Sequence, residues 1–226
     1  MSNIIRKETF DFLKQLRDNN NREWFDEHKP IFKEYEVDVK SFFSEVASQL
    51  QETDQIGSYR VYRIYRDVRF SKDKTPFKSR FAGGFGRATE ALRGGYYLNI
   101  EPGNSIVGGG FYGPNPADLK RIRLELEQDD SELRNIINDK KFKAMFGELV
   151  GSEVKTSPKG FDIEHPAIDL IRKKQFIFAR KFTDEQVSNP NFLNEVIDTY
   201  LTIRPFFDYM SSVLMTNLNG ESILED

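Results

Sequence analysis

The sequence predicts one α+β domain over residues 1–214, in which helices surround a largely antiparallel sheet, followed by a polar C-terminal tail, residues 215–226. Two observations predict this fold. Helical periodicity dominates both ends of the chain, whereas short aromatic and β-branched runs with turn signals between them fill residues 59–112. The hydrophobic content of 38%, with 20 Phe, is enough for a sizeable core, and no repeat or low-complexity linker divides the chain.

The chain begins with a predicted helical hairpin. Residues 8–18 carry an apolar helical stripe made of Phe10, Leu13 and Leu16. A longer helical pattern runs from Arg22 to about Leu50, and Asn21 is a suitable N-cap for it. We expect Pro30 to break or kink this helix, because its ring removes a backbone donor and clashes with the preceding turn.

Strands are predicted in the middle of the chain and once more near its end. They cover residues 59–70, 80–85, 95–101, 105–112 and 175–182. The EPGN sequence at residues 101–104 is typical of a hairpin turn between the third and fourth strands. The fourth strand has no side chains at its three glycines, 108–110, so another element can approach its backbone closely.

Four further helices are predicted, over residues 115–128, 129–149, 167–174 and 191–214. Asn115 is a candidate cap of the first, with Pro116 suited to its first turn. The C-terminal helix has a predicted buried stripe and contains Pro205, which we expect to bend it. The stripe comprises Leu193, Val196, Ile197, Tyr200 and Leu201.

Composition excludes several classes of protein. The chain has no Cys, which rules out disulfides and thiolate chemistry. No apolar run approaches the roughly 18 residues that a membrane helix needs, and the first residues lack the apolar core of a signal peptide. We therefore expect a cytoplasmic protein that does not enter a membrane.

Charge is unevenly distributed. The whole chain has a net charge of −3, but residues 60–93 contain ten Lys or Arg and three Asp or Glu, a local balance of +7 that leaves −10 for the remainder. A basic island in an acidic protein indicates a defined anion site and not a generally basic surface.

The centre of this island is RVYRIYRDVRFSKDKTPFKSRF, residues 60–81, which we call the basic segment. If its strand ends near Asp67, the chain can fold back so that Arg66, Lys74 and Lys78 converge. Arginine binds phosphate through two parallel hydrogen bonds, and lysine adds a mobile point charge. The predicted ligand-binding residues are Arg63, Arg66, Asp67, Arg69, Lys74 and Lys78, with Asp67 orienting a guanidinium group.

Aromatic residues alternate with these cations. Rings in such positions can stack on bases, as in proteins that bind single strands, so the expected ligand is a phosphate-bearing molecule, either a nucleotide or a nucleic acid. The rings are Tyr59, Tyr62, Tyr65, Phe70 and Phe77. A structural interpretation stays open: the arginines can pair with carboxylates of neighbouring elements and the rings can belong to the core.

RIYRDVRFSKDKTPFKSRFAGG resembles the signature R-x-x-R-D-x-R-F-x-x-x-K-x-P-[FY]-K of an uncharacterised family, domain-of-unknown-function family twenty-four sixty-one, found mainly in bacteria and in some fungi. Phe77 stands where that family often has Tyr. NREWF near the start and PKGFDIEHPAIDLIRKKQF later extend the resemblance over most of the chain. The resemblance implies a compact α+β domain of this length and implies no activity.

Two other functions stay open. One is an enzyme acting on a phosphorylated or carboxylated small molecule, with Asp67, Glu101 or His165 as acid or base. The other is a scaffold or interaction domain whose basic segment is an internal ion-pair network. His165 is better explained as a cap of its loop, and His28 as an exposed helix residue. The two histidines lack partners at the spacing of metal ligands, so we predict no metal site. The sequence leaves the identity of any cofactor unknown.

Overall fold

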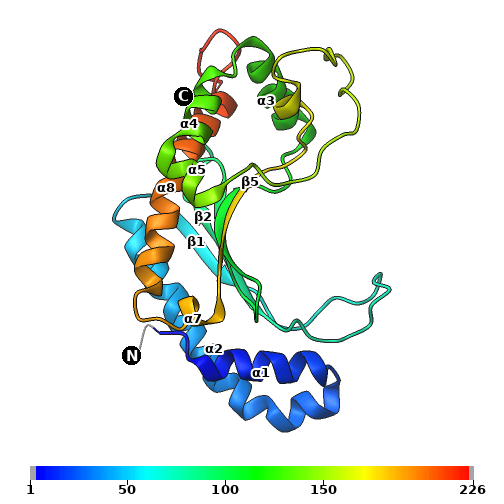
Figure 1. Cartoon of the computed structure of the whole chain (residues 1–226), viewed down its shortest axis with the longest axis vertical. Coiled ribbons are helices and arrows are strands. Elements are labelled where there is room, and N and C mark those ends of the chain that lie inside the picture. The colour runs from blue at the N-terminus through cyan, green and yellow to red at the C-terminus, as the bar shows by residue number, and fades with distance from the viewer. Residues whose placement is uncertain (1–3, 224–226) are drawn as a thin grey trace. The chain divides into compact units, whose positions relative to one another are not determined.

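The computed structural model describes residues 4–223, which form eight helices and five strands (Figure 1). The helices are α1 (Lys7–Asp18), α2 (Arg22–Gln51), α3 (Pro116–Gln128), α4 (Ser131–Asn138), α5 (Lys140–Phe146), α6 (Ile168–Ile171), α7 (Asp184–Val187) and α8 (Phe192–Met215). The strands are β1 (Ile56–Val61), β2 (Phe81–Arg87), β3 (Gly95–Ile100), β4 (Ser105–Phe111) and β5 (Phe176–Phe182).

The strands form one antiparallel sheet in the order β1-β2-β3-β4-β5, so each strand pairs with its neighbours in sequence. The predicted α+β class is confirmed, and β2 to β5 lie within two residues of their predicted bounds. The first strand was wrongly placed over residues 59–70, because β1 begins earlier and ends at Val61. Beyond Val61 the aromatic residues that suggested a strand lie on irregular extended chain.

Contacts within the chain divide it into two compact units. Unit 1 comprises Met1–Gly86, Tyr97–Val107 and Lys181–Asp198. Unit 2 comprises Arg87–Tyr96, Gly108–Arg180 and Thr199–Asp226. The single domain ending at residue 214 stays a prediction, and each unit is described by itself.

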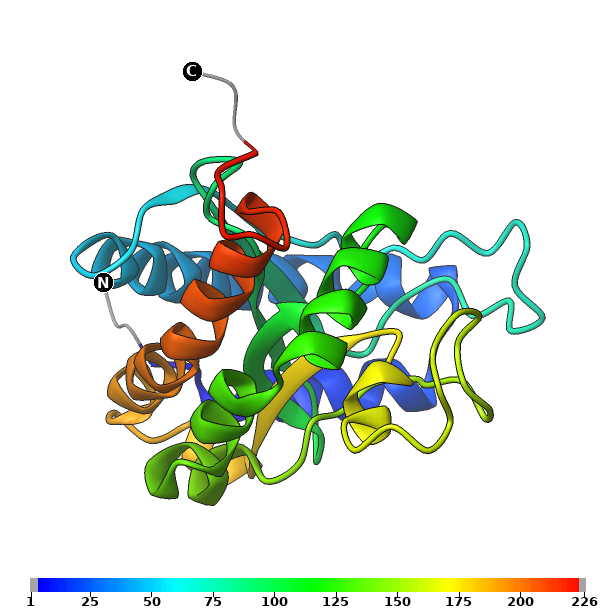
Figure 2. The same cartoon turned by 90° about the horizontal axis from the view of Figure 1, so that it is seen from above.

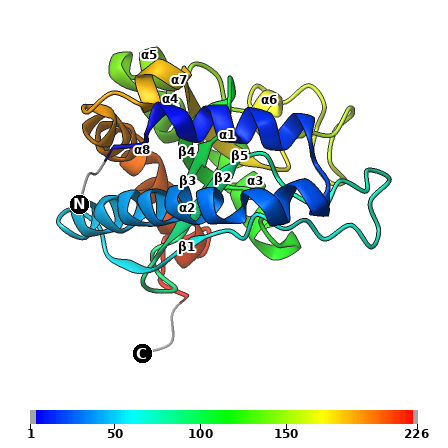
Figure 3. The same ribbon diagram turned by 90° about the horizontal axis from the view of Figure 1, so that it is seen from below.

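In unit 1, α1 and α2 lie side by side (Figures 1 and 3). The predicted α1 stripe is confirmed, since Phe10, Leu13 and Leu16 are all buried. The Asn21 side chain accepts a hydrogen bond from the Trp24 N–H, which confirms the predicted cap of α2. The expected break at Pro30 is wrong, because α2 continues through it. Pro30 is exposed, so water can satisfy the carbonyl one turn earlier, which lacks its helical partner.

Helix α2 packs its aromatic face on β2. Phe32 stacks on Phe81 with ring centroids 5.7 Å apart, and Phe43 stacks on Phe85 at 5.5 Å. Gly83 lies between these contacts, and a Cβ there would come within 2.5 Å of the Phe43 ring and 2.3 Å of the Arg60 carbonyl oxygen. This close packing fixes β1 and β2 against α2, and the basic segment is the connection between those two strands.

In unit 2, Asn115 caps α3 by accepting a hydrogen bond from the Asp118 N–H, as predicted. The single helix expected over residues 129–149 is wrong, because it is divided into α4 and α5 at Asp139. The Asp139 carboxylate accepts hydrogen bonds from the backbone N–H groups of Lys141 and Phe142, and this cap starts a new helix. A long loop, yellow-green in Figure 2, then connects α5 to the short α6.

The glycine run of β4 is explained within unit 2. A Cβ on Gly108 would lie 2.1 Å from the Phe178 carbonyl oxygen, and one on Gly110 would lie 2.1 Å from that of Phe176. The element that approaches the backbone is therefore the neighbouring strand β5. The expectation of a close approach at residues 108–110 is confirmed.

Helix α8 has nearly the predicted bounds and continues through Pro205. Val196 and Tyr200 are buried as predicted, but the placement of Leu201 in the buried stripe is wrong, since Leu201 is 42% exposed. In the described part of the chain, no helix combines sufficient length and apolar character to cross a bilayer.

Candidate functional site

The basic segment folds as an irregular hairpin that leaves the ends of β1 and β2 (Figures 1 and 3, teal). Tyr65 and Phe77 form an isolated antiparallel bridge. The Arg66 N–H donates to the Pro76 carbonyl at 2.8 Å, and the Lys78 N–H donates to the Ile64 carbonyl at 2.8 Å. The chain therefore folds back as expected, with residues 67–75 as the tip of the hairpin.

Helices α1 and α2 anchor the returning arm of the hairpin through Phe77. The Asn20 side chain donates to the Phe77 carbonyl and accepts from the Phe77 N–H, both at 3.0 Å. The Phe77 ring is buried and stacks on Phe25 with ring centroids 4.0 Å apart. These contacts fix the position of the backbone that carries the Lys78 and Arg80 side chains.

A hollow of about 440 Å³ lies beside this anchor, entirely within unit 1. We call it the unit 1 hollow. Its lining contains four cationic side chains and two carboxylates, an excess of positive charge. The lining residues are Arg17, Asn20, Arg66, Asp73, Thr75, Phe77, Lys78, Ser79, Arg80 and Glu101.

Arg66 is held in the hollow by the tip of the hairpin. Its Nη1 donates to the Asp73 carboxylate and to the Thr75 hydroxyl. Both contacts use Nη1, so Nε and Nη2 are left for a further acceptor. The Thr75 N–H and then the Arg66 guanidinium hold the pKa of Asp73 at about 2, so this carboxylate stays ionised throughout the neutral range.

Lys78 lies among cations. Its Nζ donates to the Arg63 carbonyl at 3.0 Å, and within the described residues it makes no ion pair with a carboxylate. Burial lowers the pKa of Lys78, and the positive charges of Arg80, Arg63 and Arg66 lower it further. The nearest atoms of Arg80 and Glu101 are 3.8 Å apart, a loose pair. An anion in this hollow would relieve the repulsion among these cations.

Of the six predicted ligand-binding residues, Arg66 and Lys78 line the hollow and the other four do not. Asp67 orients a guanidinium as expected, but it is that of Arg69, whose Nη2 lies 2.7 Å from a carboxylate oxygen of Asp67 in an exposed pair. Lys74 donates to the Val68 carbonyl at 2.9 Å, so it does not converge with Arg66 and Lys78 on the hollow. The Arg63 side chain is exposed.

Sequence reasoning missed several residues of the hollow. Arg80 follows Lys78 by two residues, a spacing that puts side chains on one face of an extended chain and could have suggested a shared position. Arg17 and Asn20 come from the end of α1 and from the turn after it, and only the fold brings them to the basic segment.

One of the three acid or base candidates lies at the unit 1 hollow. Only Glu101 lines the unit 1 hollow, where its Oε2 accepts from the side-chain amides of Asn99 and Asn104 at 3.1 Å each. His165 caps its loop as expected, since its Nδ1 accepts from the Ala167 N–H at 3.1 Å. The expected exposure of His28 is wrong, because its ring is half-buried and stacks on Trp24 at 3.9 Å.

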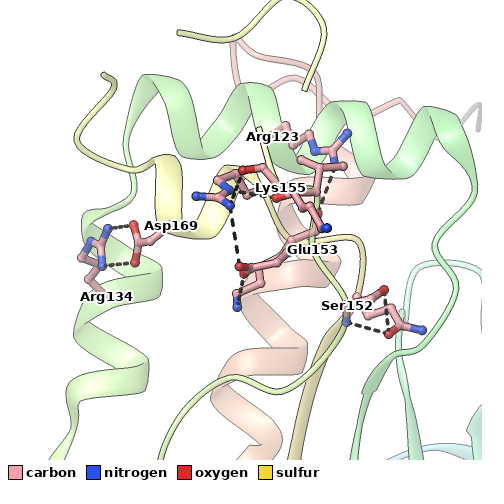
Figure 4. Close-up of polar contacts among 10 residues, drawn as sticks. Arg123, Arg134, Ser152, Glu153, Lys155 and Asp169 are labelled. Carbon is pink, nitrogen blue, oxygen red and sulfur yellow. Dashed lines mark hydrogen bonds and ion pairs between the residues drawn. The ribbon is translucent and has the colours of Figure 1, made fainter. Parts of the chain in front are cut away.

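A second hollow, of about 340 Å³, lies within unit 2 (Figure 4). We call it the unit 2 hollow. It also combines four cations with carboxylates, here three. Its lining residues are Arg134, Ile137, Asn138, Lys143, Gly147, Glu148, Leu149, Glu153, Asp169, Leu170, Arg172 and Lys173.

Three of the four cations of the unit 2 hollow contact carboxylates or backbone carbonyls, and the fourth, Lys143, donates to the side-chain oxygen of Asn138 at 3.3 Å. Figure 4 shows Arg134 facing Asp169, and its guanidinium pairs with Asp169 and with Asp130, each at 2.7 Å. The hydrogen bond that Arg134 donates to the Asp169 carboxylate is the main reason that the pKa of Arg134 is raised. Lys173 pairs with Glu153 at 2.7 Å, and Arg172 donates to the carbonyls of the loop between α5 and α6. Arg172 and Lys173 thus fasten that loop.

Among residues 4–223, no cluster of three or more His, Asp or Glu side chains has the arrangement of a metal site.

Comparison with known proteins shows the family. The model of the family described as "Conserved hypothetical protein (DUF2461)" matches residues 8–209, which confirms the family expected from the resemblance of the basic segment. No curated protein and no solved structure matches the chain. Because the family model covers most of its length, the chain belongs to the DUF2461 family of conserved hypothetical proteins.

Proposed function

We propose that the protein binds a phosphate-bearing ligand in the unit 1 hollow, with Arg66 and Lys78 as the main contacts. The observation that carries this proposal is the surplus of cations around one hollow: Lys78 has no carboxylate partner among the described residues, and neighbouring arginines contribute to its lowered pKa. Cations crowded in this way favour a bound anion, which restores the charge balance.

Phosphate fits the donors that the hollow offers. The Nε and Nη2 groups of Arg66 form one edge of the guanidinium, and this edge can donate two parallel hydrogen bonds to a phosphate. Lys78 adds a compact charge, and the Ser79 hydroxyl is a further donor on the same arm. The hollow of about 440 Å³ is within the size range of small-ligand sites, so a mononucleotide is a suitable probe.

Calorimetric titration of the whole chain with inorganic phosphate and with ADP tests the proposal. We expect saturable binding that weakens as salt is raised, because the contacts are between charges. Lys78→Met should weaken it at least roughly 10-fold. Lys143→Met is the matched control, since Lys143 lines the unit 2 hollow and contacts Asn138 there.

Two results would overturn the proposal. One is a titration in which neither phosphate nor ADP gives a heat of binding. The other is binding that Lys78→Met and Lys143→Met weaken equally, which would mean a general charge effect. If neither ligand binds and Arg66→Met lowers the thermal midpoint, the basic segment is an internal ion-pair network.

A further inference from the structure

Exposed aromatic rings are concentrated in one stretch of unit 1. The described part of the chain has five exposed large aromatic residues, and four of them lie between residues 59 and 70. Tyr59 and Tyr62 are each 43% exposed, Tyr65 is 45% exposed and Phe70 is 97% exposed. Monomeric proteins rarely leave aromatic rings grouped in water without a partner, so this stretch has the composition of a binding surface.

Arginines alternate with these rings. Arg60 and Arg63 are both exposed, and in the described residues neither forms an ion pair with a carboxylate. Each follows a tyrosine directly in the sequence. The stretch therefore offers ring faces and free positive charges in alternation, whereas the acidic groups nearby, Asp67 and Asp73, are already paired with Arg69 and Arg66.

Two of the rings are supported from behind. Tyr59 lies against Phe85 with ring centroids 6.0 Å apart, and Tyr65 contacts Phe25 at 6.0 Å and Phe77 at 5.4 Å. A ring that packs against the core and is also exposed to water is held in position before a ligand arrives. Such a ring loses little conformational freedom when a flat group stacks on it.

The row of rings begins on the edge strand of the sheet and passes beside the unit 1 hollow. β1, which carries Tyr59 and Arg60, is the edge strand of the sheet formed by the described residues. Tyr65, the third ring of the row, contacts Phe77, which lines the hollow, and Lys78 Nζ binds the Arg63 carbonyl. An extended chain lying along this stretch can thus reach the hollow.

We infer that residues 59–70 bind a single-stranded nucleic acid, whose bases stack on Tyr59, Tyr62, Tyr65 and Phe70 and whose phosphates contact Arg60 and Arg63. This inference rests on the proposed function, because one further phosphate of the strand occupies the unit 1 hollow at Arg66 and Lys78. Alternating rings and cations suit a single strand, in which bases and phosphates also alternate, and every base offers a face for stacking. In a duplex the bases are stacked on each other and the rings have nothing to contact.

Fluorescence anisotropy of the whole chain tests the inference, with labelled oligo-dT and oligo-U of about 12 nucleotides, a length within the usual site size of single-strand binders. Unlabelled duplex DNA of the same length is the competitor. We expect the single strands to bind at least about 10-fold more tightly than the duplex, with an affinity that falls steeply between about 50 mM and 200 mM salt. The two labelled strands distinguish DNA from RNA, and tight binding of either supports the inference.

Substitutions of single aromatic residues test which rings contact the nucleic acid. Tyr62→Ala and Phe70→Ala should each weaken strand binding by about 5-fold to 100-fold, whereas Tyr62→Phe, which keeps the ring, should retain it. Neither ring contacts the buried rings of unit 1, so the fold should survive. Tyr112→Ala is the matched control, since Tyr112 is an exposed tyrosine of unit 2.

The same variants separate this inference from the proposed function. Tyr62→Ala should bind inorganic phosphate and ADP like the unaltered protein, and Lys78→Met should lose both small ligands and strands. If phosphate binds but strands bind no better than the duplex, or if Tyr62→Ala and Phe70→Ala bind strands normally, the inference is wrong and the proposed function stands. Strand binding that is insensitive to Lys78→Met would show that the strand does not use the hollow, and that outcome also overturns the inference as stated.

Discussion

The two hollows have nearly the same inventory of charges but different electrostatics. Each is lined by four Lys or Arg side chains, with two carboxylates in unit 1 and three in unit 2. In unit 2, Arg134 pairs with two carboxylates and its pKa is raised. In unit 1, Lys78 has cations as its charged neighbours and its pKa is lowered by burial and by those cations.

This difference shows that the number of cations in a site does not identify an anion site. What matters is whether each cation already has its acceptors. The guanidinium of Arg172 and that of Arg123 are bound to backbone carbonyls, and Arg172 also lies 3.9 Å from Glu153. Arg172 and Lys173 of the unit 2 hollow therefore stabilise local structure, whereas Lys78 of the unit 1 hollow has no carboxylate partner among the described residues.

The strongest test of this comparison exchanges one arginine for methionine in each hollow. Arg66→Met should weaken phosphate and ADP binding by roughly 10-fold to 100-fold, because it removes a bidentate charged contact, and should change stability little, because its partner Asp73 is mostly exposed. Arg134→Met should leave binding unchanged. Calorimetric titration of both variants measures the affinities.

The effects of the two substitutions on stability should have the reverse order, with Arg134→Met the more destabilising. Arg134→Met leaves Asp130 and Asp169 without their partner, and we expect a loss of about 1 to 2 kcal/mol, below that of a fully buried pair because the groups are partly exposed to solvent. For a chain of this size the thermal midpoint should fall by roughly 2–8 °C. The comparison fails if urea denaturation finds Arg66→Met to be the more destabilising variant.

Removing the charge of Asp73 should increase the difference in phosphate binding between the two hollows. The Asp73 carboxylate holds Arg66 Nη1, and with a pKa of about 2 it competes with a bound anion at every pH near neutrality. Asp73→Asn keeps a side chain of the same size without the charge, so phosphate binding should tighten several-fold. Glu153→Asn, an equivalent loss of charge in the unit 2 hollow, should leave phosphate binding unchanged. Weaker binding by Asp73→Asn would mean that Asp73 positions Arg66 for the ligand.

A smaller effect is expected at alkaline pH. The pKa of Lys78 lies below its ordinary value of 10.5, so Lys78 loses its charge at a lower pH than a free lysine and phosphate binding should decline there. Between that lowered pKa and 10.5, Lys78 is protonated to a larger extent in the unfolded chain than in the folded chain. The contribution of Lys78 to the free energy of unfolding therefore increases as pH rises through this window. Lys78→Arg stays charged, and its phosphate affinity should not fall over the same range. Titrations in steps of pH check this, and parallel declines in both proteins would contradict it.

Most of the fold could be predicted from the sequence because its signals are local. Alternating apolar residues bounded by turns placed β2 to β5, and cap residues placed the starts of α2 and α3. The errors occurred where two local signals compete. Asp139 lies within a helical pattern and is itself a good cap, and its capping bonds divide α4 from α5.

The candidate site was predictable only in part. The return of the chain after residue 67 brought Arg66 and Lys78 together, because backbone pairing between the two arms is a short-range feature of the basic segment. Arg17 and Asn20 could not be found, since their place depends on how α1 packs in unit 1. Lys74 was assigned wrongly to the convergence because its Nζ reaches a carbonyl at the tip of the same loop.

The hairpin tip has a consequence for the lifetime of the protein in a cell. Arg69, Lys72 and Lys74 are exposed there, around a Phe70 that touches almost nothing, and such a loop is where a trypsin-like protease cuts a folded chain most readily. Arg66 and Lys78 stand on the two arms of the hairpin, so a molecule held by both would tie the arms together and keep the tip closed to the protease. If the protein binds the proposed ligand, occupied protein should outlast empty protein, and the amount of protein in the cell would follow the supply of that ligand.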